Sequence, residues 1–322
     1  MNSPALRVRN LCVWLETKTG PIPLVDGISF SINAGQSTGL VGESGCGKTM
    51  TAKAIMGQVP ATGIGVSSGG IEVNGRDIYP LSARQKRSVL GRDIAMIFQQ
   101  PATALDPVFT TGQQISAVYR RHCGGSRGQV RQRTLEALRD VGFSQAEDIA
   151  AAYPHQLSGG MRQLAMIAMA TVCKPAVIIA DEPTTALDSS SRALILRQLG
   201  QLQTSHQTAI LFISHDLSVV RQICDDVMVM YCGRIAEKAD CRSLFTHARH
   251  PYSAGLLSCI PQLGKTRPPP IRSIPGQVPA AAELPAGCHF APRCNRAVAQ
   301  CRQSVPRLDA NDGGGAACFR PL

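Results

Sequence analysis

A glycine-rich turn between a short apolar strand and a helix-compatible segment constrains this chain more than any other feature. In STGLVGESGCGKTMTAKAIMG, the residues from Thr38 to Val41 predict a strand that runs into the turn. The match to G-x-x-x-x-G-K-[ST] is complete and comprises Gly42, Glu43, Ser44, Gly45, Cys46, Gly47, Lys48 and Thr49, followed by Met50. Such glycines let backbone N–H groups close around phosphate oxygens, while Lys48 and Thr49 suit the β- and γ-phosphates and Mg²⁺. The sequence therefore predicts a nucleotide-phosphate site in an α/β fold.

An acidic pair follows a second apolar strand far downstream. The residues from Ala176 to Ala180 predict a buried strand that ends in Asp181 and Glu182. Open α/β sheets bind their ligands at the carboxyl ends of strands. Asp181 suits a direct or water-mediated Mg²⁺ contact, and Glu182 is placed to polarise an attacking water. Together with the phosphate loop, this pair predicts nucleotide hydrolysis.

Composition and charge narrow the class of protein. A length of 322 residues with 44% hydrophobic content is ordinary for a globular chain of about two domains. The most apolar segment, AMIAMATVCKPAVIIA, is broken by Lys174 and Pro175 and falls short of the roughly 20 apolar residues of a membrane span. The amino terminus lacks the pattern of a secretory signal, so we expect a cytoplasmic protein. A net charge of +11 with only 4% aromatic residues favours a solvated basic surface over a base-stacking one.

Three further motifs indicate which class of nucleotide-hydrolysing protein this is. In YPHQLSGGMRQ, Ser158 is placed to cap a helix from Met161 to Val172, which would expose N–H groups to an anion. FQQP contains Gln99, and ISHDL contains His215. In the order in which they occur, these motifs resemble those of the ATP-binding cassette family.

The resemblance implies a fold and a domain division. We expect a RecA-like P-loop core with an antiparallel β subdomain near the amino terminus and an inserted helical subdomain at about residues 100–170. The cassette would span residues 1–250, and a cysteine-containing extension would span residues 251–322. The segment RQRTLEALRDVG, with apolar residues at helical spacing, fits the inserted helices.

The resemblance also assigns roles to single residues. Glu182 would be the catalytic base, His215 would contact the γ-phosphate, and Gln99 would sense Mg²⁺ and water and couple to a membrane subunit. Mg²⁺ would be held through Thr49, Gln99 and Asp181. The ATP of an opposite cassette would be bound by the signature residues Leu157, Ser158, Gly159, Gly160 and Met161. Asp188 would cross the dimer interface.

Two positions depart from the family's pattern. The residue after Leu-Ser-Gly-Gly is Met161 where the family commonly has Gln, and Gln163 follows two residues later. An aromatic residue that stacks on adenine is not obvious. Trp14, upstream of the phosphate loop, is the candidate for that role.

The carboxy-terminal part resembles the extension of ATPase subunits from the dipeptide and oligopeptide importers, a subgroup that also includes nickel importers. The resemblance is based on the segments HPYSAGLL and GCHFAPRC and on a Pro-rich stretch from Thr266 to Pro279. Four cysteines cluster there with the spacing C-x5-C-x6-C-x16-C, namely Cys288, Cys294, Cys301 and Cys318. Four thiolates suit either Zn²⁺ or an iron–sulfur cluster, and the resemblance favours [4Fe-4S].

The resemblance predicts an ATP-hydrolysing subunit of an importer of di- or oligopeptides, with nickel or another small solute as the alternative cargo. Its partners would be a paralogous ATPase in a heterodimer, two membrane permeases and an external solute-binding protein. The chain would then lie at the cytoplasmic face of the inner membrane, attached through the permeases. A cassette ATPase that acts on nucleic acid or ribosomes is the rival class. It is disfavoured because this chain has neither a second cassette nor C-x2-C zinc pairs.

Overall fold

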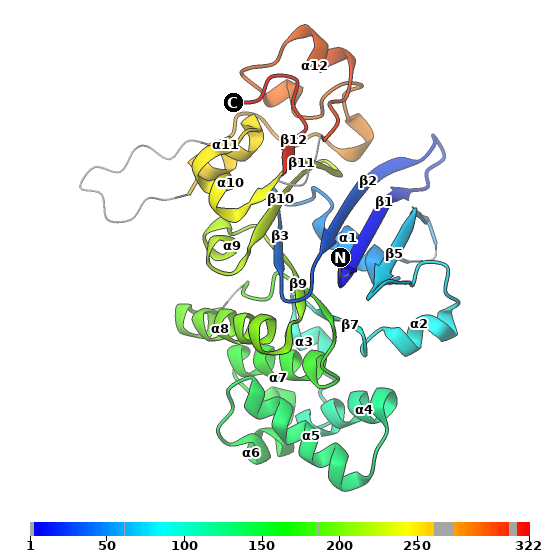
Figure 1. Ribbon diagram of the computed structural model, residues 1–322, viewed down its shortest axis with the longest axis vertical. Helices are drawn as coiled ribbons and strands as arrows, with labels where there is room; N and C mark the ends of the chain where they lie inside the picture. Colours follow the sequence, from blue (N-terminus) through cyan, green and yellow to red (C-terminus); the bar gives the residue numbers. More distant parts are fainter. Residues whose placement is uncertain (1–2, 61, 186, 261–272, 309–313) are drawn as a thin grey trace, which may run out of the picture. The chain divides into compact units, whose positions relative to one another are not determined.

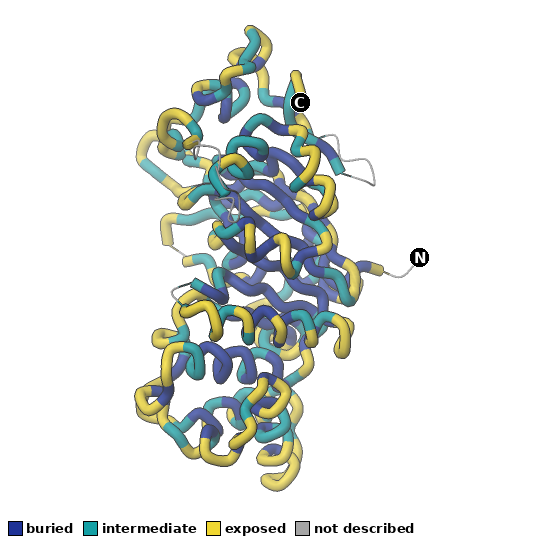
Figure 2. The backbone as a smooth tube through the Cα atoms, turned by 90° about the vertical axis from the view of Figure 1, so that its left-hand side faces the viewer, coloured by how far each residue is buried: buried dark blue, intermediate teal, exposed yellow. Residues whose placement is uncertain are grey.

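The computed structural model describes residues 3–60, 62–185, 187–260, 273–308 and 314–322. The chain divides into two compact units, each assembled from separate segments and each described by itself. The first comprises Met1–Arg7, Ser31–Ser37 and Gly70–Phe212, and the second comprises Val8–Phe30, Thr38–Gly69 and Ile213–Leu322. Each unit contains strand residues that are fully buried, and buried stretches of the chain are dark blue in Figure 2.

A buried set of strands forms the centre of the first unit. β7 (Ile94–Ile97) pairs in parallel with β8 (Val177–Asp181), and β9 (Ala209–Ser214) begins on the other side of β8. Every residue of these three strands is buried. Near-continuous apolar runs of this kind form strands that are covered on both faces. The functional residues that follow β7 and β8 are therefore held on a rigid base.

Helices make up most of the remainder of the first unit (Figure 1). α4 and α5 begin with capping boxes, in which Thr110 pairs with Gln113 and Ser126 pairs with Gln129. The helices are α2 (Ala83–Val89), α3 (Pro101–Ala104), α4 (Thr111–Cys123), α5 (Arg127–Asp140), α6 (Ala146–Ala151), η1 (Pro154–Gln156), α7 (Gly159–Thr171) and α8 (Ser189–His206). A short antiparallel pair of β5 (Gly70–Val73) and β6 (Arg76–Asp77) also belongs to this unit. Helices thus occupy the region where the inserted subdomain is expected.

The second unit contains the phosphate loop. β3 (Ser37–Val41) leads through the loop into α1 (Lys48–Ile55) and pairs in parallel with β10 (Asp226–Tyr231). β10 pairs in antiparallel fashion with β11 (Arg234–Asp240), which in turn pairs with β12 (Gly315–Ala316). Most of β1 (Leu6–Leu15) and β2 (Ile22–Ile32) lies here too, and β1 is antiparallel to β4 (Ile64–Ser67).

The described part of the carboxy-terminal extension also belongs to the second unit. It is coloured from yellow to red in Figure 1. The extension is preceded by α9 (Leu217–Ile223) and α10 (Cys241–His247). Its own helical elements are α11 (Pro251–Ser258), η2 (Ala281–Glu283), η3 (Ala291–Arg293) and α12 (Ala299–Gln303). The Pro-rich stretch falls partly outside the described residues, and the predicted domain boundary at residue 250 stays a prediction. Within the described ranges, no helix is long and apolar enough to cross a membrane.

Candidate nucleotide site

The phosphate loop needs glycine at both of its ends. Gly42 has φ 153° and Gly47 has φ 110°, conformations that side chains disfavour. A Cβ atom on Gly42 would lie 2.2 Å from the Met230 carbonyl oxygen, and one on Gly47 would lie 2.7 Å from the Leu24 carbonyl oxygen. The neighbouring strands therefore permit this loop only because glycine stands at the two positions.

Lys48 is buried within the loop, with 6% of the residue exposed. Its ammonium donates to the carbonyl oxygen of Gly42 over 2.8 Å and to that of Glu43 over 3.0 Å. Thr51 Oγ1 donates to the carbonyl oxygen of Gly47 over 3.0 Å, which ties the first turn of α1 to the loop. The positive charge is thus held by the same backbone that would surround a phosphate, as such loops require.

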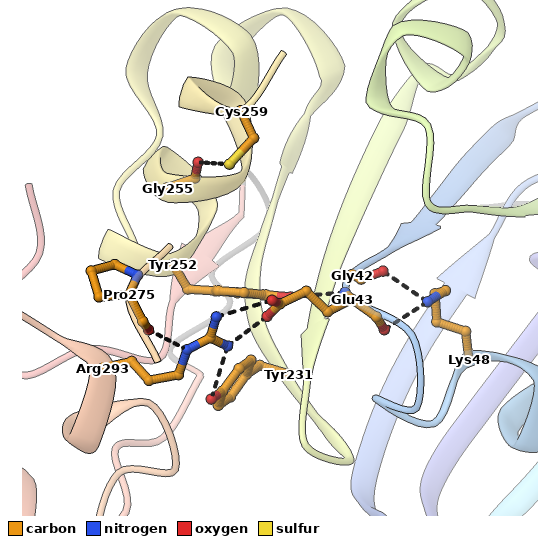
Figure 3. A network of polar contacts seen from close by, with 9 residues as sticks. All are labelled: Gly42, Glu43, Lys48, Tyr231, Tyr252, Gly255, Cys259, Pro275 and Arg293. Atoms are coloured by element: carbon orange, nitrogen blue, oxygen red, sulfur yellow. Dashed lines mark hydrogen bonds and ion pairs between the residues drawn. The ribbon is translucent and has the colours of Figure 1, made fainter. Parts of the chain in front are cut away.

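Glu43 connects the loop to distant parts of the second unit, a relationship that sequence reasoning missed. Its N–H donates to the hydroxyl of Tyr252 over 2.9 Å. Its carboxylate accepts two hydrogen bonds from the Arg293 guanidinium, over 2.7 and 3.0 Å (Figure 3). Tyr252 and Arg293 lie in HPYSAGLL and GCHFAPRC, so these segments were visible in the sequence, but their contact with the loop was not.

The first unit brings Gln99 and Glu182 together after β7 and β8. Gln99 Nε2 donates to Glu182 Oε2 over 3.3 Å, and Thr185 Oγ1 donates to the same oxygen over 2.8 Å. Glu182 has φ 49°, a left-handed conformation that is uncommon for residues with side chains and clusters at functional sites. Asp181, at the end of β8, is 3% exposed. Glu182 and Gln99 are therefore in direct contact, and the buried Asp181 directly precedes Glu182.

The signature segment begins α7 as the sequence predicts. Ser158 caps the helix, because its Oγ accepts from the Met161 N–H over 3.3 Å. Leu157 is buried, whereas Ser158 and Gly159 are exposed. Arg162 Nε donates to the Leu157 carbonyl oxygen over 3.1 Å and secures the turn before the helix. The exposed N–H groups at this helix start are accessible to an anion.

Asp188 lies close to the signature segment through Ser191. Ser191 Oγ donates to Asp188 Oδ2 over 2.7 Å, and a Cβ atom on Gly160 would lie 2.5 Å from the same Oγ. Asp188 caps α8, with Oδ1 accepting from the N–H groups of Ser190 and Ser191. Hydrogen bonds from the Ser190 side chain, and then from Ser191, hold the pKa of Asp188 well below its ordinary value. Asp188 is therefore a fixed anion on an exposed surface.

His215 and Trp14 both lie in the second unit. His215 is exposed directly after β9, before the α9 helix that Asp216 caps. Trp14 lies on β1 opposite Gly65 of β4, and its indole N–H donates to Glu16 Oε1 over 2.6 Å. The γ-phosphate contact of His215 and the adenine contact of Trp14 stay predictions.

The metal group that the sequence predicts at the four tail cysteines stays a prediction. Among the described residues, no group of three or more His, Cys, Asp or Glu side chains is arranged to hold a metal ion. Cys301 is buried and the other three are half-buried, and the Cys288 N–H donates to the Cys301 carbonyl oxygen over 2.8 Å. Burial and backbone pairing therefore both contribute to the order of this region.

Two of the tail thiols have raised pKa values, to which other tail thiols contribute. Burial raises the pKa of Cys288, and the thiols of Cys301 and Cys318 raise it further. Burial also raises the pKa of Cys318, with added contributions from Cys294 and Cys301. The neighbouring His289 has its Nδ1 3.2 Å from the carbonyl oxygen of Cys232.

Comparison with known proteins identifies two family regions. Residues 25–185 match the ABC transporter model, and residues 236–301 match the model of the oligopeptide/dipeptide transporter C-terminal region. The oligopeptide transport ATP-binding protein AppD of Bacillus subtilis is 43% identical over 98% of this chain and 97% of its own length. The dipeptide transport ATP-binding protein DppD of Escherichia coli is 40% identical over the same shares of the two chains.

Solved structures agree with the predicted fold. The structure of cbiO1 from Clostridium perfringens has a TM-score of 0.65 and 26% identity, covering 77% of this chain and 92% of that one. The ATP-binding cassette MJ0796, solved as a dimer with ADP and phosphate, has the same TM-score at 23% identity, over 74% of this chain and 99% of that one. The predicted α/β cassette fold is confirmed, and the chain belongs to the ATP-binding cassette transporter family, with the C-terminal region typical of its oligopeptide and dipeptide transporters.

Proposed function

We propose that this chain is the ATP-hydrolysing subunit of an importer that takes up di- or oligopeptides. The observation that carries the proposal is the phosphate loop with buried Lys48, found together with a matching peptide-transporter C-terminal region in one chain. Relatives with 40–43% identity over nearly the whole length are named as oligopeptide and dipeptide transport ATP-binding proteins. Import of nickel or another small solute by the same machinery is the alternative.

The proposed roles of the ATP-site residues follow from their chemistry. The loop from Gly42 to Met50 surrounds the phosphates through its backbone N–H groups, and Lys48 supplies the positive charge. Mg²⁺ prefers hard oxygen donors. The proposed donors are the hydroxyl of Thr49, the amide oxygen of Gln99 and the buried strand-end carboxylate of Asp181. Mg²⁺, when bound, neutralises charge on the β- and γ-phosphates.

Glu182 is the proposed general base. Its Oε2 already accepts hydrogen bonds from Gln99 and Thr185, which orient the carboxylate. An oriented carboxylate at a strand end is suited to taking a proton from a water that attacks the γ-phosphate. His215 is proposed to contact the same phosphate.

A second cassette is proposed to complete the site. Ser158 and Gly159 are exposed at the start of a 13-residue helix, which allows them to reach ATP held by another subunit. Asp188, a fixed anion near the same helix, is proposed to lie at that interface. We propose a paralogous ATPase as the partner.

The proposed membrane partners dock on the helical part of the first unit. Val108 and Phe109 are 69% and 50% exposed just before α4. A groove of about 660 Å³ lies beside them and is lined by residues that include Phe109, Gly112, Ala117, Leu135 and Ala151. Large exposed apolar side chains beside a groove are typical of interaction surfaces. The chain would thus be a peripheral subunit at the cytoplasmic face, bound to two permeases that receive cargo from a solute-binding protein.

Reconstitution tests this proposal. The chain is assembled with its partner ATPase, permeases and binding protein in nanodiscs, and ATP hydrolysis is measured with and without a peptide library or nickel. We expect peptides to stimulate hydrolysis and Lys48→Ala to abolish it, whereas Lys18→Ala, at an exposed lysine of the same unit, should behave as wild type. Stimulation by nickel alone would favour the alternative cargo. Hydrolysis that survives in Lys48→Ala would contradict the assignment of the loop.

A separate proposal concerns the tail thiols: they hold a [4Fe-4S] cluster, with Zn²⁺ as the alternative. Neighbouring tail thiols help to raise the pKa of Cys288 and of Cys318, which supports it, and thiolates are the preferred ligands of both groups. Binding would require these side chains to turn toward one centre. Anaerobic purification with iron, sulfide and zinc analysis tests this, comparing Cys294→Ser with Cys123→Ser at an exposed cysteine elsewhere. A metal content that Cys294→Ser leaves unchanged would refute the proposal.

A further inference from the structure

The carboxy-terminal extension reaches the phosphate loop through one arginine. Arg293 and Glu43 are 250 residues apart in the sequence, and their side chains form a two-pronged ion pair within the second unit (Figure 3). We propose that Arg293 is a positioning residue for ATP binding, through which the extension fixes the conformation of the phosphate loop. The inference rests on the proposed function, because it assumes that the loop binds ATP.

The ion pair is specific and largely withdrawn from water. Both terminal nitrogens of Arg293 donate, one to each carboxylate oxygen of Glu43, over 2.7 and 3.0 Å. The side chain of Arg293 is 4% exposed and that of Glu43 is 28% exposed. Bidentate charge-assisted pairs of this kind are stronger and more directional than single hydrogen bonds. Loss of either partner would leave the other charge poorly compensated, so the pair resists opening.

Arg293 is itself held in place by neighbours. Its Nε donates to the Pro275 carbonyl oxygen over 2.9 Å, which fixes the plane of the guanidinium. The guanidinium carbon lies 5.9 Å from the ring centres of both Tyr231 and Phe290. These rings are almost fully buried, so the arginine is bounded by rigid groups. The guanidinium can therefore define a position for Glu43.

Tyr252 holds the backbone of the same residue. It is fully buried at the start of α11, and its hydroxyl accepts the Glu43 N–H over 2.9 Å. Its ring packs against Tyr231 and Phe290, with ring centres 4.6 and 5.3 Å away. The backbone and the side chain of Glu43 are thus fixed by two different elements that follow residue 250.

The constraint on Glu43 extends to Lys48. The carbonyl oxygen of Glu43 accepts a hydrogen bond from the Lys48 ammonium over 3.0 Å. Arg293, Glu43 and Lys48 therefore form a continuous chain of contacts from the extension to the charge that the loop presents (Figure 3).

A second route joins the extension to the loop through the turn after β10. Gly233 N–H donates to the carbonyl oxygen of Cys46 in the loop over 2.9 Å. On the other side of the turn, His289 Nδ1 lies 3.2 Å from the carbonyl oxygen of Cys232. The extension thus contacts the loop directly and also contacts the turn that supports it.

Preorganisation is the physical reason why these contacts matter for ATP. If the free loop has its binding conformation for only a fraction of the time, the apparent Kd for ATP rises by the inverse of that fraction. A loop that is tethered at Glu43 spends more time in that conformation. Loosening the tether so that the binding conformation is populated about a tenth as often raises Kd about tenfold, or about 1.4 kcal/mol.

The test measures binding of a fluorescent ATP analogue with Mg²⁺ to the purified full chain. We expect Arg293→Gln to raise Kd about tenfold and Glu43→Gln to raise it by a similar factor. The double variant should differ from either single variant by less than about twofold, because both substitutions remove the same contact. Arg293→Lys should recover part of the loss, since it keeps the charge but not the two-pronged geometry. Arg302→Gln, at an exposed arginine of the same extension, is the matched control and should bind as wild type does.

Hydrogen exchange separates a positioning role from a purely structural one. In Arg293→Gln, amides of residues 42–50 should exchange faster, while those of β7 and β8 should not change. A variant that lowers the unfolding temperature but keeps the wild-type Kd and loop exchange would overturn the inference. If Arg293→Gln does not fold, the same measurements are made on Glu43→Gln. This variant removes the ion pair at Glu43, the more exposed of the two residues.

The outcomes also separate this inference from the proposed function. If wild type fails to bind the analogue, or Lys48→Ala binds it equally well, the ATP-site assignment fails and the inference fails with it. If wild type binds, Lys48→Ala does not, and Arg293→Gln matches wild type, only the inference is overturned.

Discussion

Gln99 and Glu182 are 83 residues apart in the sequence, yet Gln99 Nε2 donates to Glu182 Oε2 over 3.3 Å. The contact orients the carboxylate that is proposed to act as general base. Thr185 Oγ1, three residues after Glu182, donates a second hydrogen bond to the same oxygen. The same hydrogen bond between Gln99 and Glu182 connects the segment after β7 with the end of β8, so a displacement of one segment would displace the other.

Glu182→Gln should retain ATP binding and lose hydrolysis. The amide is nearly isosteric and still accepts from Thr185, but it cannot take a proton from water, and loss of general-base catalysis lowers rates by about 10²–10⁴-fold. The measurement is phosphate release by the assembled transporter, with bound nucleotide quantified separately. Glu283→Gln, at an exposed glutamate of the extension, serves as control. Rapid turnover by Glu182→Gln would remove Glu182 from the role of base.

Ser158→Arg should abolish hydrolysis by a pair of cassettes while leaving this chain's own ATP binding unchanged. Ser158 is exposed at the amino end of α7, so a large cation there obstructs the surface proposed to receive the partner's γ-phosphate. Loss of the cap itself should cost only about 1 kcal/mol of stability. ATP affinity of the isolated chain and ATPase activity of the assembled pair should be compared. Equal losses in both measurements would argue that Ser158 acts on the chain's own nucleotide.

His250 should make the second unit less stable in mild acid. The residue is 3% exposed, and its Nδ1 accepts the Tyr252 N–H over 3.0 Å, which requires that nitrogen to be unprotonated. Burial lowers the pKa of His250 to about 4, although a hydrogen bond with the Ala317 backbone opposes this shift. The unfolded chain binds a proton near pH 6.5 and the native state does not, so stability falls as pH drops from 6.5 to 4. The loss amounts to roughly 3 kcal/mol.

The matched variant for this effect is His250→Asn. Its amide oxygen can accept the Tyr252 N–H and keep the helix cap, but it does not titrate. The free energy of unfolding should therefore change less between pH 7 and pH 4 in the variant than in wild type. Parallel pH profiles for the two proteins would assign the acid sensitivity to other groups.

Gly200→Ala should stabilise the chain by about 0.5–1 kcal/mol, because alanine restricts the unfolded chain and favours helix. Gly200 lies inside α8, and apart from its chain neighbours and the backbone of its own helix no heavy atom would lie within 4 Å of a Cβ atom there. Thermal unfolding should show a higher midpoint. Gly160→Ala is the contrast, because its Cβ would lie 2.5 Å from Ser191 Oγ and should bring no gain. A lower midpoint for Gly200→Ala would contradict the open space beside Gly200 in α8.

Local sequence patterns determined the family, the fold and the identity of the ATP-site segments. A few consecutive residues are enough to specify the phosphate loop, the strand that ends in Asp181 and the Ser158 cap. This is because backbone geometry and helix capping depend on residues that are near neighbours in the sequence. The helices between residues 100 and 170 were predictable for the same reason, since capping residues and apolar spacing mark them.

Contacts between distant segments were decided by the tertiary structure alone. No periodicity or motif links Glu43 to Arg293 and Tyr252, and the pairing exists because β10 and β11 place α11 and η3 beside the loop. The clustering of four cysteines in the sequence did predict a metal site, but spacing does not fix where side chains point. In the described part of the tail, Cys301 is buried and its carbonyl oxygen accepts the Cys288 N–H, a contact that the spacing did not predict. Sequence specifies which chemical groups are available, and the packing of remote segments decides which of them meet.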